Sequence, residues 1–183
     1  MNTNHQHPDP TRSRRRIARL ERRLDQACDI SEWHLLQAEI ERLGRLLDEF
    51  RMLARRPDVE LVDVLVGPLI DRVIALQQPY LEDAFVAVEC EHADDLPRVR
   101  VDRDKLTQVL INLFKNAIEA MPDGGVIRTQ THRQDGMICI RVADEGPGIP
   151  ADIDAFAPFT TTKRAGTGLG LPVARQMIAA HGG

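Results

Sequence analysis

The chain has 183 residues, of which 43% are hydrophobic, and this length suffices for one core domain with a helical extension. No apolar run approaches the roughly 20 residues that cross a bilayer, and the polar N-terminus lacks a secretory signal, so we expect a cytoplasmic chain without a membrane segment. The net charge of −4 is uneven, because residues 1–56 hold 12 Lys and Arg against 9 Asp and Glu, whereas residues 57–183 hold 12 against 19. Cys28, Cys90 and Cys139 lack the spacing of metal ligands, so we expect reduced, buried thiols.

The N-terminal third is basic and helical in character. Residues 1–11 are polar and predict a disordered tail, and Arg12–Ala27 predicts a helix that carries seven arginines. Such a run is compatible with contact to nucleic acid or to an anionic membrane. The interspersed acids Glu21 and Asp25, together with an apolar stripe, favour a solvated coiled-coil face, so we expect no nucleic-acid partner.

A second helix follows this basic segment. Asp29-Ile-Ser-Glu32 has the spacing of a capping box, and the helix should run to about Arg56 before Pro57-Asp58 breaks it. Its apolar residues recur at heptad-like spacing: Leu36, Ile40, Leu43, Leu47, Phe50 and Ala54. We therefore expect residues 12–56 to form a helical hairpin or coiled coil through which the chain makes a homodimer.

Residues 57–183 alternate between helical and strand patterns. Asp63 is a candidate cap for a helix that ends near Glu82, and a long helix spans Asp104–Met121. The expected strands are Ala84–Glu91, Arg98–Val101, Gly125–Arg133 and Met137–Ala143, and a last helix covers Pro172–Ala180. The predicted fold class is α+β, as a two-layer α/β sandwich with an antiparallel or mixed sheet and helices on one side.

Two asparagines and two glycine-dense loops carry the chemical signal. Asn112 and Asn116 are four residues apart and project from one side of the long helix. Amide oxygens are hard, neutral ligands that suit a Mg²⁺ ion already bound to phosphate, although both side chains could instead bind nearby loops. Glycines in Asp144-Glu-Gly-Pro-Gly-Ile149 and Gly166-Thr-Gly-Leu-Gly-Leu171 allow backbone N–H groups to approach phosphate. The second loop runs into a helix N-terminus, where the helix dipole favours an anion.

These segments, in this order, resemble the nucleotide-binding boxes of bacterial sensor histidine kinases. The resemblance covers about residues 60–183 and rests on four segments: Leu110–Ala120, Asp144–Ile149, Phe156–Lys163 and Gly166–Leu171. The Pro-Phe-Thr-Thr-Thr-Lys segment is most similar to the nitrogen-regulation type of kinase. The resemblance implies the fold shared with gyrase-type ATPases, and it implies ATP and Mg²⁺ as cofactors and a response-regulator receiver domain as partner.

The resemblance also implies roles for single residues. Asn116 would hold Mg²⁺, with Asn112 on the same face, and Asp144 would accept a hydrogen bond from the adenine amino group. An Asx-turn or an N-cap is the purely structural alternative for Asp144. Ile149–Ala165 would form a mobile lid anchored by Phe156 and Phe159. The remaining cofactor-binding positions that the resemblance implies are Gly146, Gly148, Thr162, Lys163, Gly166, Gly168, Leu169 and Gly170.

Three features bear on activity: one separates this chain from related ATPases, and two depart from the histidine-kinase pattern. Related ATPases place a water-activating glutamate where this chain has Asn112, and an amide is no base at neutral pH, so transfer to a protein is favoured over hydrolysis. The family's phosphoacceptor motif is missing, and His5 and His34 are the remaining candidates. Members of the family continue with two more strands at the position after Gly183. We therefore expect this chain to be either a degenerate kinase or a fragment, and a fragment would be compatible with a membrane sensor region upstream. Two functions remain open: a histidine kinase and a nucleotide-binding regulatory module.

Overall fold

The computed structural model describes residues 30–54, 58–163 and 166–183. The predicted tail of residues 1–11, the helix Arg12–Ala27, His5, Cys28 and the break at Pro57 all lie outside the described residues. Among the described residues, no helix has both the length and the apolar character needed to span a membrane.

Helix α2, Ile30–Ala54, begins within the predicted capping-box segment. Six of its described large apolar side chains are more than half exposed in the single chain: Trp33, Leu36, Ile40, Leu43, Leu47 and Phe50. An isolated helix with such a stripe leaves apolar surface in contact with water, which favours association with another helix.

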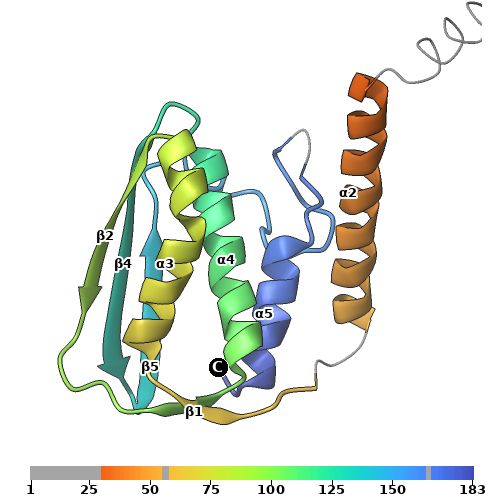
Figure 1. Ribbon diagram of the computed structural model, residues 1–183. Helices are drawn as coiled ribbons and strands as arrows, with labels where there is room; N and C mark the ends of the chain where they lie inside the picture. The colour runs from red at the N-terminus through yellow and green to blue at the C-terminus, as the bar shows by residue number, and fades with distance from the viewer. Residues whose placement is uncertain (1–29, 55–57, 164–165) are drawn as a thin grey trace, which may run out of the picture. The chain divides into compact units, whose positions relative to one another are not determined.

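Residues 58–183 hold two small sheets and three helices (Figure 1). Strand β1 (Val62–Val64) pairs antiparallel with β3 (Val99–Val101). The larger sheet has the order β2-β4-β5, in which β2 (Val86–His92) is parallel to β4 (Gly125–Gln134) and β4 is antiparallel to β5 (Met137–Ala143). This arrangement confirms the predicted α+β class with a mixed sheet.

Three helices accompany the larger sheet: α3 (Val66–Asp83), α4 (Arg103–Ala120) and α5 (Gly170–Ala180). In Figure 1, α3 and α4 cover one face of the sheet and α5 packs beside α4. Their apolar faces meet the sheet in a core whose side chains are almost completely buried, including Ile70, Val73, Phe114 and Ile127. A second cluster joins α4 to α5 through Val109, Val173, Ala174 and Met177.

The expected strands and helices correspond closely to the observed ones, with one correction. Asp63 does not cap a helix, because it lies inside strand β1, which the sequence analysis missed. A three-residue strand is too short to show the alternation by which strands are recognised, and Leu65 is the residue that precedes α3. The turn between β4 and β5 has the conformation that its Asp-Gly sequence favours. Asp135 and Gly136 both adopt positive φ, as a two-residue hairpin turn of this type requires.

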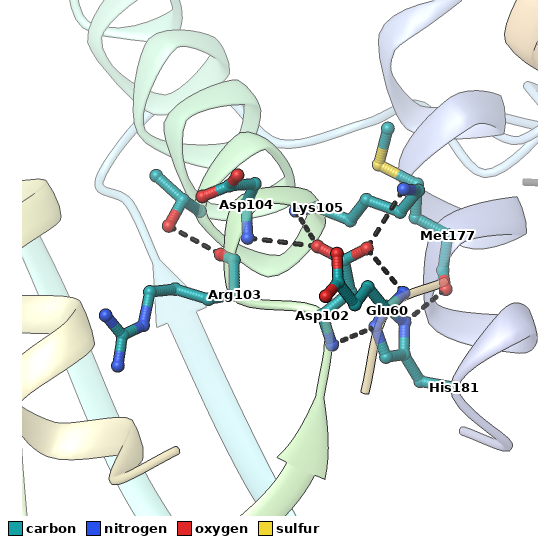
Figure 2. A network of polar contacts seen from close by, with 8 residues as sticks. Glu60, Asp102, Arg103, Asp104, Lys105, Met177 and His181 are labelled. Carbon is teal, nitrogen blue, oxygen red and sulfur yellow. Dashed lines mark hydrogen bonds and ion pairs between the residues drawn. The ribbon is translucent and has the colours of Figure 1, made fainter. Parts of the chain in front are cut away.

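Asp102 joins the start of α4 to two distant segments (Figure 2). Its Oδ1 accepts hydrogen bonds from the N–H groups of Asp104 and Lys105 at 3.1 and 3.0 Å, which makes it the N-cap of α4. Its Oδ2 accepts hydrogen bonds from the Glu60 N–H and the Lys105 ammonium, both at 3.0 Å. Its own N–H donates to His181 Nε2, just after α5, at 2.9 Å. One buried carboxylate thus fixes the helix that carries both predicted asparagines.

Candidate functional site

The two asparagines lie on the flank of α4, beside its buried apolar face. Both are partly buried, and the structure brings Asn112 against the first residue of α5. A Cβ added to Gly170 would lie 2.6 Å from Asn112 Oδ1, so glycine is what allows the start of α5 to approach the asparagine side chain. Two of the predicted segments therefore meet at this point.

A cation already contacts the predicted metal ligand. The Lys163 ammonium lies 3.4 Å from Asn116 Oδ1, 3.3 Å from the Asn116 carbonyl oxygen and 2.7 Å from Glu119 Oε2. The sequence analysis missed Glu119, although its position three residues after Asn116 places it on the same side of α4. Amide, carbonyl and carboxylate oxygens together make a surface that favours a positive charge.

Asp144 is exposed at the end of β5. Its Oδ1 accepts a hydrogen bond from the Gly146 N–H at 2.9 Å, so the Asx-turn that was the structural alternative is present. A carboxylate offers about four lone-pair positions, so this turn leaves acceptor capacity for a ligand. Gly146 is required here by space, because an added Cβ would lie 2.8 Å from the Ala120 Cβ at the end of α4.

The neighbouring Glu145 ties the Asp144 loop to the sheet, and the sequence analysis assigned it no role. Its carboxylate accepts hydrogen bonds from the Val126 N–H at 3.2 Å and from the Arg128 guanidinium at 2.9 Å. Hydrogen bonding and charge from Glu145, and then from Glu89, raise the pKa of Arg128 above its ordinary value. Two interactions therefore hold the loop: the Asx-turn between Asp144 and Gly146, and the ion pair between Glu145 and Arg128.

The predicted lid, Ile149–Ala165, is described up to Lys163. Phe156 packs under the guanidinium of Arg175, whose Cζ lies 5.2 Å from the ring centroid and whose Nη2 donates to the Phe156 carbonyl at 3.2 Å. Phe159, the other expected anchor, has a side chain that is 64% exposed. The Phe159 backbone makes the attachment instead, because its N–H donates to the Gly168 carbonyl at 3.0 Å.

The second glycine loop closes against this segment. Gly168 has a φ of +66°, and an added Cβ would lie 2.5 Å from the Phe159 carbonyl carbon. Gly166 is equally confined, since a Cβ there would collide with the Thr161 hydroxyl. Leu169 is buried and occupies the N-cap position of α5. Its apolar side chain cannot accept hydrogen bonds from the N–H groups in the first turn of the helix, so this helix N-terminus has no side-chain cap. Thr162 is exposed beside Lys163.

The described part of the site contains neither candidate phosphoacceptor side chain. His34 belongs to α2, and its side chain lies outside the described detail, while His5 lies outside the described residues. The described site therefore consists of α4, the Asp144 loop, the segment up to Lys163 and the loop that starts α5. In chemical terms it offers a cation-binding oxygen surface, a helix N-terminus without a side-chain cap, and an exposed carboxylate.

The sequence profile of the family described as "Histidine kinase-, DNA gyrase B-, and HSP90-like ATPase" matches residues 101–183. Sensor histidine kinase ZraS of Escherichia coli (strain K12) is 36% identical over 151 residues, which is 81% of this chain and 32% of ZraS. The chain thus spans about a third of the length of this curated relative.

Solved structures agree with this match. The catalytic domain of histidine kinase ThkA is 34% identical with a TM-score of 0.60, and the match covers 67% of this chain and 82% of that domain. ThkA in complex with response regulator protein TrrA is 28% identical with a TM-score of 0.68, covering 81% of this chain and 43% of that one. Full-length ShkA in complex with AMPPNP is 26% identical with a TM-score of 0.69, and the match covers 76% of this chain and 31% of the ShkA chain.

Proposed function

The chain belongs to the sensor histidine kinases and forms their ATP-binding catalytic region, and from this premise we propose that it transfers the ATP γ-phosphate to a protein histidine. The phosphate would then pass to an aspartate of a response-regulator receiver domain. The solved complex of ThkA with the response regulator TrrA supports this kind of partner. Since ATP and response regulators of this kind are cytoplasmic, we place the catalytic region in the cytoplasm.

The observation that carries the proposal is the contact of Lys163 with Asn116. An ammonium already lies against the amide oxygen, with the Glu119 carboxylate beside it, so the donor set fits a divalent cation. We propose that Asn116 holds Mg²⁺, which neutralises phosphate charge when bound. Lys163 would then leave Asn116 for the phosphates, together with Thr162, when the nucleotide enters.

The loops supply the remaining contacts in this proposal. Asp144 would accept a hydrogen bond from the adenine amino group, while Gly146 and Gly148 let the loop pass beneath the base. Gly166, Gly168, Leu169 and Gly170 would present backbone N–H groups to the triphosphate at the start of α5. Asn112 would lie on the same face of α4 as Asn116, where the glycine at position 170 lets the start of α5 approach its side chain. Since an amide is no general base, the bound nucleotide would be poorly hydrolysed by water.

A second function is favoured by one feature of the sequence. Neither His5 nor His34 is followed by an acidic residue that takes up the imidazole proton, because Gln6 and Leu35 stand there. A nucleotide-binding dimer that regulates a partner without phosphorylating it is therefore the alternative. We expect this chain alone to remain unlabelled by γ-phosphate in either case.

Incubation with γ-labelled ATP separates the two functions. The chain is tested alone and with an intact acceptor hairpin from a histidine kinase, with Asn116→Ala as the blank and Lys115→Ala as the control on the same helix. Acid-labile label on the hairpin supports the kinase, and its loss in Asn116→Ala but not in Lys115→Ala supports the metal ligand. Nucleotide binding without any transfer would favour the regulatory module. Acid-labile label on the chain itself would contradict the expectation of no self-labelling and would favour His5 or His34 as the acceptor.

A further inference from the structure

Three potential metal ligands converge at the interface between α3 and β2, away from the candidate nucleotide site. They are Asp71 from α3 and Cys90 and His92 from β2, and their ligand atoms all lie within 4.8 Å of one another. Cys90 and His92 are two residues apart on a strand, so both point to the face that α3 covers. The expectation of a buried thiol is wrong for Cys90, which is exposed and lies beside two other potential metal ligands.

Both neighbours of the histidine approach the same ring nitrogen. His92 Nε2 lies 3.3 Å from Cys90 Sγ and 3.2 Å from Asp71 Oδ1, whereas Nδ1 lies farther from Cys90 Sγ, at 4.0 Å. A nucleophilic Cys-His-Asp triad has another geometry, because there the carboxylate contacts the ring nitrogen that the thiol does not use. One imidazole nitrogen has one hydrogen or one lone pair, so it serves two partners poorly, whereas a cation between the three atoms contacts all of them.

The spacing fits a small tetrahedral ion. With Zn–S, Zn–N and Zn–O bonds of about 2.3, 2.0 and 2.1 Å, neighbouring ligand atoms of a tetrahedral zinc site lie about 3.3 to 3.6 Å apart. The two distances from His92 Nε2 are close to these values. The Asp71 side chain is 63% exposed and is therefore free to turn until its oxygen completes the third edge.

The outer contacts also match a metal-bound histidine. His92 Nδ1 lies 3.2 Å from Thr131 Oγ1, and Thr131 is opposite His92 in the parallel pairing of β2 with β4. A partner on the second ring nitrogen fixes the orientation and tautomer of a ligating histidine.

We propose that Asp71, Cys90 and His92 bind one Zn²⁺ ion per chain, with the fourth position open to water or to a partner. The thiol and imidazole favour zinc over Mg²⁺ or Ca²⁺, which take oxygen ligands. Because the ligands come from α3 and from β2, the ion links the first helix of the domain to the sheet. This site is independent of nucleotide binding, so the failure of either proposal leaves the other standing.

Cobalt and zinc titrations of the full chain, stripped of metal and reduced, test the proposal. Co²⁺ should give a thiolate-to-cobalt charge-transfer band that saturates at one equivalent and that one equivalent of Zn²⁺ removes. Cys90→Ser should lose the band and bind Zn²⁺ on the order of 100-fold more weakly, or worse, while Cys139→Ser, the same change on β5, should behave as wild type. Thr131→Val, which removes only the contact to His92 Nδ1, should weaken Zn²⁺ binding by about 10- to 100-fold.

Thermal unfolding supplies a second measurement. Zn²⁺ should raise the Tm of the wild type and of Cys139→Ser but not that of Cys90→Ser or Asp71→Asn, and Mg-ATP binding should persist in all four. If Cys90→Ser does not fold, Asp71→Asn carries the test with the same two readouts. The absence of a thiolate band in the wild type would overturn the proposal. A band that survives in Cys90→Ser and disappears in Cys28→Ser or Cys139→Ser would overturn it equally.

Discussion

At the scale of single residues, Asp102 shows how a carboxylate stabilises the helix that carries the site. Its side chain is 9% exposed. Burial by itself would raise the pKa of Asp102. This effect is outweighed by hydrogen bonds from the N–H groups of Glu60 and Lys105 and by the hydrogen bond and positive charge of the Lys105 ammonium. Together these interactions lower the pKa to about 2. Since the ordinary value is 3.8, the ionised carboxylate contributes about 2 kcal/mol to the free energy of unfolding at neutral pH.

The same residue makes a prediction about acid. Because the folded-state pKa is depressed, the contribution is complete above the unfolded-state pKa near 4 and is lost as the pH falls toward 2. Asp102→Asn keeps an oxygen for the helix cap but presents an amide NH₂ to donors, and we expect it to lower the free energy of unfolding by about 2 kcal/mol at pH 7. Urea unfolding between pH 7 and pH 3 checks this, and the variant should show the flatter dependence on pH below 5.

Asp104→Asn is the matched control for this prediction. Asp104 is exposed in the first turn of the same helix, so its substitution should cost less than about 1 kcal/mol, the size of a charge–dipole contribution. Equal pH dependence of the wild type and Asp102→Asn would contradict the account of the buried carboxylate. His181 completes the network, since its Nε2 accepts a hydrogen bond from the Asp102 N–H and its Nδ1 lies 2.7 Å from the Met177 carbonyl oxygen.

Asp144 provides the residue-scale prediction for ligand choice. Asp144→Asn retains an oxygen for the Asx-turn to Gly146 but loses the second carboxylate oxygen, so the loop should persist while the hydrogen bond to adenine weakens. A lost charge-assisted hydrogen bond costs roughly 1.5–3 kcal/mol, so calorimetry should show ATP affinity falling by about 10- to 100-fold. The wild type should bind GTP far more weakly than ATP.

Asp154→Asn is the control for this measurement, because Asp154 forms the same kind of turn with the Phe156 N–H at 2.9 Å. That variant should bind ATP like the wild type. Equal affinity of the wild type for ATP and GTP would remove Asp144 from base recognition, whatever the variants do.

At the scale of elements, the two glycine loops differ in what confines them. Gly148 and Gly168 both have positive φ, at +74° and +66°. An added Cβ at Gly148 meets nothing within 4 Å, whereas at Gly168 it would lie 2.5 Å from the Phe159 carbonyl carbon and 2.6 Å from the Thr160 nitrogen. The backbone pairing of Phe159 with Gly168 therefore depends on glycine for space as well as for conformation.

This contrast predicts unequal effects of the same substitution. Gly148→Ala should cost about 1–2 kcal/mol of stability, from backbone strain alone. Gly168→Ala adds the displacement of backbone atoms and should cost about 1–3 kcal/mol more, with a clear loss of ATP affinity as the start of α5 moves. Thermal unfolding and calorimetry on the two variants measure both effects, and the prediction fails if Gly148→Ala is the more damaging change.

At the scale of the whole molecule, the exposed apolar stripe of α2 favours packing against a second helix. Six large apolar side chains, each more than half exposed in the single chain, are too many for a lone helix in water. We expect a homodimer that forms through residues 12–56 and that a shorter chain of residues 57–183 does not form. Sedimentation at micromolar concentration tests this expectation, and a monomeric full chain would rule it out.

Two substitutions with the same added charge locate the dimer contact. Ile40→Glu lies on the stripe and Gln37→Glu does not, although both side chains are exposed in the single chain. Ile40→Glu should give a monomer, since a buried, unpaired carboxylate at a helix interface is costly, whereas Gln37→Glu should stay dimeric. Dissociation by both variants would point to a general charge effect instead of a defined interface.

The sequence by itself determined the helices and strands of residues 58–183 wherever apolar residues recur with a clear period. Helix α4 and the β4–β5 hairpin were expected almost to the residue, because their periodicity is a local signal. Strand β1 was missed, since three residues carry no period and its pairing with β3 depends on a segment 35 or more residues away. The segments that contain the glycines and asparagines could be recognised from the sequence for the same reason, because each is a short local pattern.

Only the tertiary structure decided which side chains meet across those distances. Lys163 contacts Asn116 and Glu119 although 47 and 44 residues separate them, and Asp102 receives hydrogen bonds from Glu60 as well as donating one to His181. Cys90 and His92 were not paired by the sequence analysis, and nothing in the sequence places Asp71 beside them. Local patterns fix the conformation of a segment, whereas contacts between segments follow from how their buried faces pack, which the chain settles only when it folds.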